Sequence, residues 1–293
     1  MTTAIPSYQQ GRLAPVPDEI DALDLTVTGT LPTELTGRYF RNGPNPLPGQ
    51  VSNHWFTGQG MVHGVRLRAG RAEWYRNRWV RTSRMRGAPP YGPDGPDLAA
   101  VNANTSVIRH ADRIFALVES GLPHELTGTL DTVGPCDFGG RLHTAMTAHP
   151  KQDPVTGELH FFGYGARPPY LTYHRLSAAG ELVASMPVEV PGPTMMHDFA
   201  ITDRHVVWLD LPVVFDLSLL GRGMPYRWDD RYGARLGVMP LPGGEPSGGA
   251  ASLATRWFEV DPGYVFHVGN AETGPDGRVT LDAVRYGPAE FQG

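Results

Sequence analysis

The sequence has one cysteine, one lysine and no extended stretch of uninterrupted apolar residues. A single cysteine, Cys136, cannot form a disulfide within the chain, and it excludes zinc motifs that are built from paired cysteines. Because no stretch of about 18 apolar residues is present, no transmembrane helix is predicted. The first residues also lack the apolar core of a secretory signal peptide. Together these absences predict a protein of the reducing cytoplasm.

The charged residues give no sign of a nucleic-acid partner. The formal net charge is −5, and the 25 basic residues are scattered along the chain rather than gathered in a stripe. Glycine (36) and proline (28) are abundant without a fixed period, while 40% of the residues are hydrophobic. This combination favours many turns between short buried strands over disorder. A chain of 293 residues is compatible with one large all-β domain.

Strand-like segments recur in pairs that are separated by short turns. Val65–Arg68 precedes Arg71–Trp79 across two turn residues, and Ser106–His110 precedes Arg113–Glu119 in the same way. Further pairs of this kind follow towards the C-terminus, and long amphipathic helical stretches are missing. The pattern predicts antiparallel hairpins and an all-β fold.

One internal echo favours a propeller over a sandwich. Leu31–Gly37 (LPTELTG) recurs as Leu122–Gly128 (LPHELTG), 91 residues later. Propeller blades are about 40 to 50 residues long, so the offset is close to two blades. The echo and the series of hairpins together predict a β-propeller.

Three of the 11 histidines are candidates for a shared metal site. His149, His197 and His267 each lie on the first strand of a separate predicted hairpin. Radial repetition brings equivalent strands together around one axis, and neutral imidazoles bind iron, copper, zinc or nickel. Their spacing alone leaves a structural role open. The remaining histidines are assigned to packing or to turns.

Seven stretches, in order along the chain, carry a resemblance to a known family. They are Gly37–Pro46, His54–His63, Asn104–Val107, Ala116–Glu119, Thr147–Lys151, Met196–Thr202 and His267–Ala271. In these stretches the sequence resembles the carotenoid cleavage oxygenase family, which also includes stilbene cleavers and the isomerase of the retinal pigment epithelium. The resemblance runs from residue 25 to Tyr286. It implies an N-terminal extension over residues 1–24 and a propeller domain over residues 25–293.

The resemblance implies a seven-bladed β-propeller with a ferrous ion (Fe²⁺) on its axis, held by four histidines. His149, His197 and His267 match the first three, and Glu119 matches a glutamate that accepts a hydrogen bond from a ligand imidazole. Such a carboxylate fixes the tautomer of the ring and raises its basicity. Family members continue past the length of this chain, and their later part carries the fourth histidine. We therefore expect the propeller to be incomplete at the C-terminus.

The implied activity is that of a non-haem Fe²⁺ dioxygenase, which cleaves a conjugated C=C bond with O₂ and forms carbonyl products. The implied partners are O₂ and an apolar polyene, either a carotenoid or an apocarotenoid. Leu209–Leu220 is the best candidate for a peripheral membrane contact, although core packing explains the same apolar pattern. The sole lysine, Lys151, follows a predicted ligand by two residues. It is not an obvious contact for the phenol of a stilbene, which favours a carotenoid-type substrate.

Three other interpretations stay open. The chain could be an inactive or weakly metal-binding propeller fragment, because an open propeller leaves an unpaired sheet edge. It could keep the fold and the iron but cleave stilbenes or catalyse an isomerisation. Sites built from histidine alone also accept zinc, which would rule out the activation of dioxygen.

Overall fold

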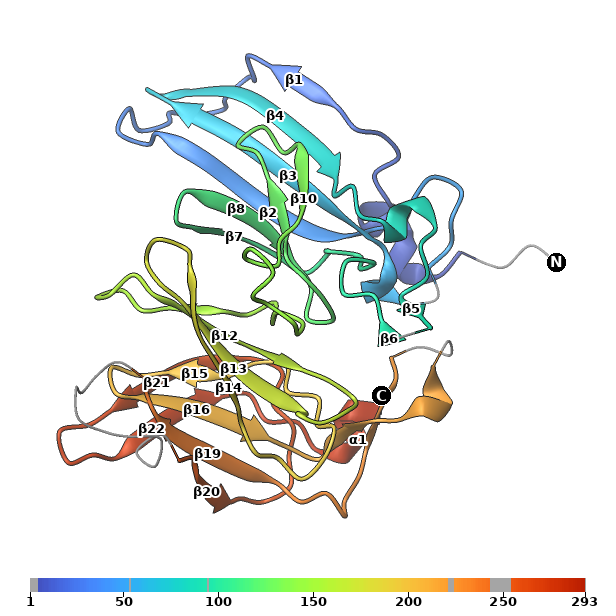
Figure 1. Cartoon of the computed structure of the whole chain (residues 1–293). Helices are drawn as coiled ribbons and strands as arrows, with labels where there is room; N and C mark the ends of the chain where they lie inside the picture. The colour runs from blue at the N-terminus through green and yellow to red at the C-terminus, as the bar shows by residue number, and fades with distance from the viewer. Residues whose placement is uncertain (1–4, 53, 94, 221–223, 243–253, 293) are drawn as a thin grey trace. The chain divides into compact units, whose positions relative to one another are not determined.

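The computed structural model describes residues 5–52, 54–93, 95–220, 224–242 and 254–292. The chain divides into two compact units, residues 1–148 (unit 1) and residues 149–293 (unit 2). Antiparallel β-sheets make up both units, as the sequence predicts (Figure 1). The helices among the described residues are short: η1 (Ser7–Gln9), η2 (Gly11–Leu13), η3 (Trp55–Thr57), η4 (Arg84–Arg86), η5 (Leu217–Leu219) and α1 (Pro288–Gln292). None of these described helices is long and apolar enough to cross a membrane.

The first sheet of unit 1 has four antiparallel strands. In sheet order these are β1 (Asp21–Leu23), β4 (Arg71–Trp79), β3 (Gln59–Arg68) and β2 (Gly37–Asn45). Ala69 and Gly70 join β3 to β4, and both have positive φ angles, as a two-residue hairpin turn that matches the strand twist requires. Strand β1 falls inside the predicted N-terminal extension and pairs with β4. The domain boundary at residue 25 stays a prediction.

The second sheet of unit 1 repeats this four-stranded plan. In chain order its strands are β7 (Ser106–His110), β8 (Arg113–Leu117), β9 (His124–Leu126) and β10 (Thr132–Pro135). A small separate hairpin consists of β5 (Tyr91–Gly92) and β6 (Gly95–Pro96). One buried apolar cluster fills unit 1 between these sheets: Val62, Val80, Val101, Ala103, Ala116, Leu126 and Leu130.

The sequence echo does not mark a structural repeat. Leu31–Gly37 passes through a turn and reaches β2 only at its last residue, whereas the second copy, Leu122–Gly128, contains the whole of β9. The two copies therefore occupy different places in their sheets. The repeated unit of the fold is the four-stranded sheet itself, which has the architecture of a propeller blade.

Unit 2 contains two more sheets of four strands and two hairpins (Figure 1). The first sheet is β11 (Lys151–Gln152), β12 (Leu159–Tyr164), β13 (Leu171–Leu176) and β14 (Leu182–Pro187). The second is β15 (Ala200–Ile201), β16 (His205–Asp210), β19 (Arg235–Pro240) and β20 (Arg256–Glu259). The hairpins are β17 (Val213–Phe215) with β18 (Tyr226–Trp228), and β21 (Val268–Thr273) with β22 (Val279–Ala283).

An aromatic core joins the two four-stranded sheets of unit 2. Phe199 stacks on Trp208, with ring centroids 5.5 Å apart and planes inclined by 14°. Phe162 of β12 meets both rings edge-on, at 5.2 Å and 6.0 Å. All three side chains are fully buried. Edge-to-face and stacked aromatic pairs add stability beyond the area that they bury, so this core holds the two sheets in a fixed relation.

The segment Leu209–Leu220, the predicted membrane contact, is largely a part of the core. Leu209, Leu211 and Val213 are buried, whereas Leu217 in η5 is 73% exposed. Core packing therefore explains the first half of this apolar pattern. A membrane contact through the second half stays a prediction.

Candidate metal centre

Three histidine side chains of unit 2 converge. One ring nitrogen from each of His149, His197 and His267 lies within 4.8 Å of the other two. Nε2 of His149 is 3.2 Å from Nε2 of His197. The three centroid-to-centroid distances are 4.7, 4.9 and 5.0 Å, so the rings form a nearly equilateral triangle. The fold thus brings together the three residues that the sequence singled out.

Each of these histidines precedes the first strand of its sheet. His149 lies two residues before β11, His197 three residues before β15, and His267 directly before β21. The prediction that they lie on the strands is wrong by these few residues. Pro150 has no N–H to donate to a ladder, and the Asp198 carboxylate accepts the next backbone N–H at 2.9 Å. Both effects delay the start of the strand that follows.

Hydrogen bonds tie together the segments that carry the second and third histidines. Ahead of the histidines, the Tyr264 hydroxyl donates to the carbonyl of Met195 at 2.9 Å. Beyond them, the hydroxyls of Thr202 and Thr273 lie 2.7 Å apart. Tyr264 is only 1% exposed, and a hydrogen bond in such low-dielectric surroundings is stronger than one in water. These links hold the two imidazoles close together through the fold itself.

The three rings face one another at steep angles, and burial affects the charge of one of them. The ring planes are inclined by 61°, 86° and 75° to one another. Burial, together with the neighbouring His197 and His267, lowers the pKa of His149 to about 4. His149 is therefore neutral at neutral pH. Neutral imidazole is the form that offers a lone pair to a metal ion.

A buried carboxylate beside the centre was not predicted from the sequence. Asp198 directly follows His197 and is 2% exposed. It accepts a hydrogen bond from the Val268 N–H at 2.9 Å and forms an ion pair with Lys151 at 2.7 Å. One signal could have revealed it, because Asp198 is a lone carboxylate in the otherwise uncharged stretch Met195–Thr202. Such a group needs charged or hydrogen-bonding partners when it is buried.

Glu119, the predicted support for an imidazole, belongs to unit 1. It lies in the turn that follows β8 and is half-buried. The three histidines belong to unit 2. Its role as a hydrogen-bond acceptor for a ligand ring stays a prediction.

Other histidines have structural contacts, in agreement with the roles predicted for them. Nδ1 of His54 accepts a hydrogen bond from the Phe56 N–H at 3.1 Å and so caps η3. Three more have a ring nitrogen beside a hydroxyl group: His63 with Tyr75 at 2.8 Å, His160 with Tyr173 at 2.6 Å, and His174 with Ser185 at 2.8 Å.

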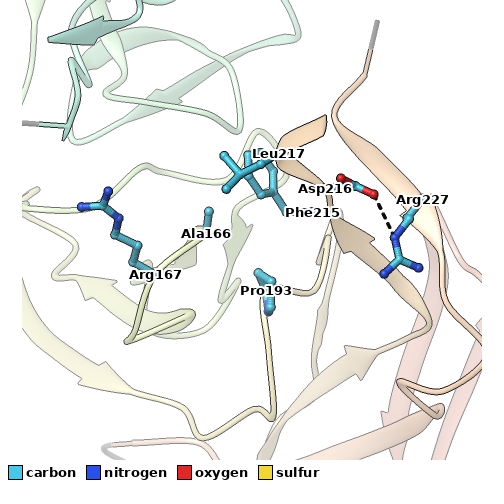
Figure 2. A pocket seen from close by; sticks show the side chains of 7 residues that line it. All are labelled: Ala166, Arg167, Pro193, Phe215, Asp216, Leu217 and Arg227. Carbon is cyan, nitrogen blue, oxygen red and sulfur yellow. Dashed lines mark ion pairs between the residues drawn. The ribbon is translucent and has the colours of Figure 1, made fainter. Parts of the chain in front are cut away.

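A cavity of about 340 Å³ lies elsewhere in unit 2 (Figure 2). In this view Arg167 stands on one side, and Asp216 forms its ion pair with Arg227, at 3.0 Å, on the other. The lining consists of Ala166, Arg167, Pro193, Phe215, Asp216, Leu217 and Arg227. None of the three converging histidines lines this cavity, so it is separate from the candidate metal centre.

Comparisons with known proteins agree with the fold and with the sequence motifs. The family model described as retinal pigment epithelial membrane protein matches residues 13–292. A carotenoid cleavage oxygenase of Mycobacterium tuberculosis is 42% identical over 95% of this chain and 65% of its own length. A carotenoid 9,10(9',10')-cleavage dioxygenase of Arabidopsis thaliana is 37% identical over 90% of this chain and 55% of its own. The chain therefore spans less than two thirds of the length of these relatives.

Solved structures show the same likeness. The lignostilbene dioxygenase of Pseudomonas brassicacearum matches with a TM-score of 0.81 and 31% identity, over 96% of this chain and 62% of that one. Cobalt-substituted Synechocystis apocarotenoid oxygenase matches with a TM-score of 0.75 and 27% identity, over 93% of this chain and 62% of that one. These matches confirm the predicted all-β fold of the propeller type. The chain belongs to the retinal pigment epithelial membrane protein family, the family of the carotenoid cleavage oxygenases.

Proposed function

We propose that His149, His197 and His267 bind a ferrous ion, and that the protein cleaves a conjugated C=C bond of a carotenoid or apocarotenoid with O₂. Two carbonyl compounds would be the products. The supporting observation is the convergence of three imidazoles, each just ahead of a different sheet, within 4.8 Å. Family membership supplies the reaction class, because the curated relatives carry the names of carotenoid cleavage enzymes.

The donor set suits a divalent transition metal. Imidazole nitrogen is a ligand for iron, copper, nickel and zinc. Two nitrogens bound about 2.1 Å from one ion in neighbouring positions lie about 3 Å apart, and the Nε2 atoms of His149 and His197 are 3.2 Å apart. Three neutral ligands would leave the full charge on the ion and leave further coordination positions open. The residues present therefore fit the proposed ion.

When bound, a ferrous ion would supply the chemistry that activates dioxygen towards the alkene. The residues of the chain supply orientation and an apolar wall. The steeply inclined imidazoles would hold the ion, and Phe266 lies edge-on to His197 with centroids 5.8 Å apart. A polyene has no group that must gain or lose a proton, so this scheme needs no protein nucleophile or general acid. Glu119 enters the proposal as the acceptor that orients one ligand ring.

A stilbene is the second candidate substrate, because the chain is similar to a lignostilbene dioxygenase. One contact favours a carotenoid instead. The sole lysine, Lys151, has its Nζ atom 2.7 Å from Asp198, so it is engaged in an ion pair rather than presented to a phenol. The predicted cytoplasmic location and peripheral membrane contact stay predictions.

The test combines metal analysis with labelled dioxygen. The full chain would be loaded anaerobically with Fe²⁺ and then exposed to ¹⁸O₂ with a carotenoid, an apocarotenoid and a stilbene. We expect bound iron and two carbonyl products from a polyene, each with one labelled oxygen. An absence of bound iron would contradict the proposal. Unlabelled geometric isomers would point to isomerisation instead, and cleavage of the stilbene alone would transfer the proposal to that substrate.

A further inference from the structure

One carboxylate contacts all three segments that carry the converging histidines. Asp198 itself directly follows the second histidine. Its Oδ2 atom accepts a hydrogen bond at 2.9 Å from the N–H of Val268, which directly follows the third. Its Oδ1 atom lies 2.7 Å from Nζ of Lys151, which follows the first by two residues. Asp198 and the two residues that it contacts each lie within two positions of a converging histidine. Asp198 therefore links the three backbone segments from which the imidazoles project.

We infer that Asp198, together with Lys151, is a positioning element that sets the metal affinity and the ligand geometry of the three-histidine centre. This role rests on the proposed metal site. Asp198 acts through the backbones that carry the ligands. Groups that orient metal ligands from outside the coordination shell have large effects on metal affinity, because they reduce the freedom of the ligands before the ion binds.

The surroundings of Asp198 make its position well determined. The side chain of Asp198 is 3% exposed, and that of Lys151 is 28% exposed. Oδ1 also accepts the N–H of Phe199 at 2.9 Å, so donors from three separate places converge on one carboxylate. The Lys151 ammonium lies 5.9 Å from the Phe199 ring centroid as well, within reach of a cation–π attraction. A buried charge with this many partners cannot move without loss of at least one contact.

Lys151 is the only lysine among the 25 basic residues of the chain. Arginine occupies every other basic position, including those in the remaining ion pairs of the described residues. The ammonium group is a compact point charge, whereas the planar guanidinium prefers paired contacts. A single ammonium fits an acceptor whose second oxygen is already taken by a backbone N–H. The position therefore favours lysine on geometric grounds.

Unit 2 offers a matched control pair away from the histidines. Asp210 and Arg235 are 2.7 Å apart, with side-chain exposures of 0% and 29%. They face each other across β16 and β19. Distance and burial are nearly the same as for Asp198 and Lys151, but neither residue is adjacent in sequence to a converging histidine. Loss of this pair measures the general effect of breaking a buried ion pair.

The experiment is a Co²⁺ titration of the full chain, followed by the d–d absorption bands of the bound ion. We expect Asp198→Asn and Lys151→Met each to weaken Co²⁺ binding roughly 10- to 100-fold and to shift the bands. The double variant should be weakened by less than the product of the two single effects, because the residues act as a pair. Lys151→Arg should restore only part of the affinity, because it keeps the charge but the planar guanidinium fits the single available oxygen less well. Asp210→Asn and Arg235→Met should lose thermal stability but keep the wild-type affinity and spectrum.

A metal-free measurement separates this role from the metal site itself. Long-range ¹H–¹⁵N spectra report the imidazole nitrogens, and we expect the three converging histidines to shift in Asp198→Asn but not in Asp210→Asn. Wild-type affinity and spectra in Asp198→Asn and Lys151→Met would overturn the positioning role. An equal loss of affinity in both pairs would overturn it too, because the effect would then be general destabilisation. Failure of the unaltered chain to bind Co²⁺ would overturn the proposed metal site, and with it the effect of Asp198 on metal affinity. Unshifted imidazole resonances in the metal-free Asp198→Asn variant would instead refute the positioning of the rings.

Discussion

Two buried histidines of unit 2 predict a specific loss of stability in acid. His160 and His174 lie on the adjacent strands β12 and β13 and are 0% and 2% exposed. Burial lowers the pKa of each from 6.5 to about 4, and the nearby Arg175 contributes to the shift of His160. Between these two pH values the unfolded chain binds more protons than the folded chain. The free energy of unfolding therefore falls as the pH drops through this window.

The magnitude follows from the size of the shift. A displacement from 6.5 to about 4 is worth about 3.4 kcal/mol per histidine once the pH is below both values. At pH 5 the ring is almost fully protonated in the unfolded chain and mostly neutral in the folded chain, so each histidine costs about 2 kcal/mol relative to pH 8. The pair together removes about 4 kcal/mol, which is a large part of the 5–15 kcal/mol typical of a folded protein.

The assay is urea denaturation of the metal-free chain at pH 8 and at pH 5, with His160→Gln and His174→Gln singly and combined. We expect the drop in the free energy of unfolding between the two pH values to shrink by about 2 kcal/mol in each single variant and by about 4 kcal/mol in the double variant. Replacement of His143, which is exposed, should leave the drop unchanged. An equal drop in the double variant and the unaltered chain would refute the reasoning.

Three further predictions concern the metal site, the core and one close backbone approach. His267→Ala removes one of the three converging ligands. Metal analysis should therefore show a larger loss of affinity than the roughly 10- to 100-fold loss that follows a change outside the coordination shell, and unchanged metal occupancy would contradict the site. Trp208→Ala empties a fully buried position and should cost about 3–5 kcal/mol in urea denaturation; a loss below about 1 kcal/mol would argue against a packed core there. At Gly60 a Cβ atom would lie 2.1 Å from the Ala103 carbonyl oxygen, so Gly60→Ala should lower the melting temperature sharply. The control Gly43→Ala meets no atom within 4 Å, and an equal loss in both variants would contradict the steric explanation.

Local chemistry made several of the β-hairpins predictable. The turns at Ala69-Gly70 and Ala111-Asp112 have positive φ angles at both residues, and two-residue hairpins require such angles to match the strand twist. The strands on either side agree with their predicted bounds to within a few residues, apart from β3, which begins earlier at Gln59. These features depend on neighbours in the chain, so a single sequence contains enough information to locate them.

Long-range packing accounts for what the sequence did not show. The echo at Leu31–Gly37 looked like a repeat, but similar residues can serve a turn in one place and a strand in another because the partner strands differ. The three histidines were expected on strands and lie ahead of them, since Pro150 and Asp198 divert backbone hydrogen bonds away from the ladder. Such effects appear only when the partners of each backbone group are known.

The candidate metal centre was likewise predictable from the sequence only in part. Motifs along the chain were enough to select His149, His197 and His267, because their neighbours resemble those of a known family. The distance of 4.8 Å within which they meet depends on how separate sheets pack. The contact of Asp198 with Val268, 70 residues away, likewise had no local signature. A carboxylate finds such a partner only after burial has removed water as the alternative, and burial is a property of the folded chain.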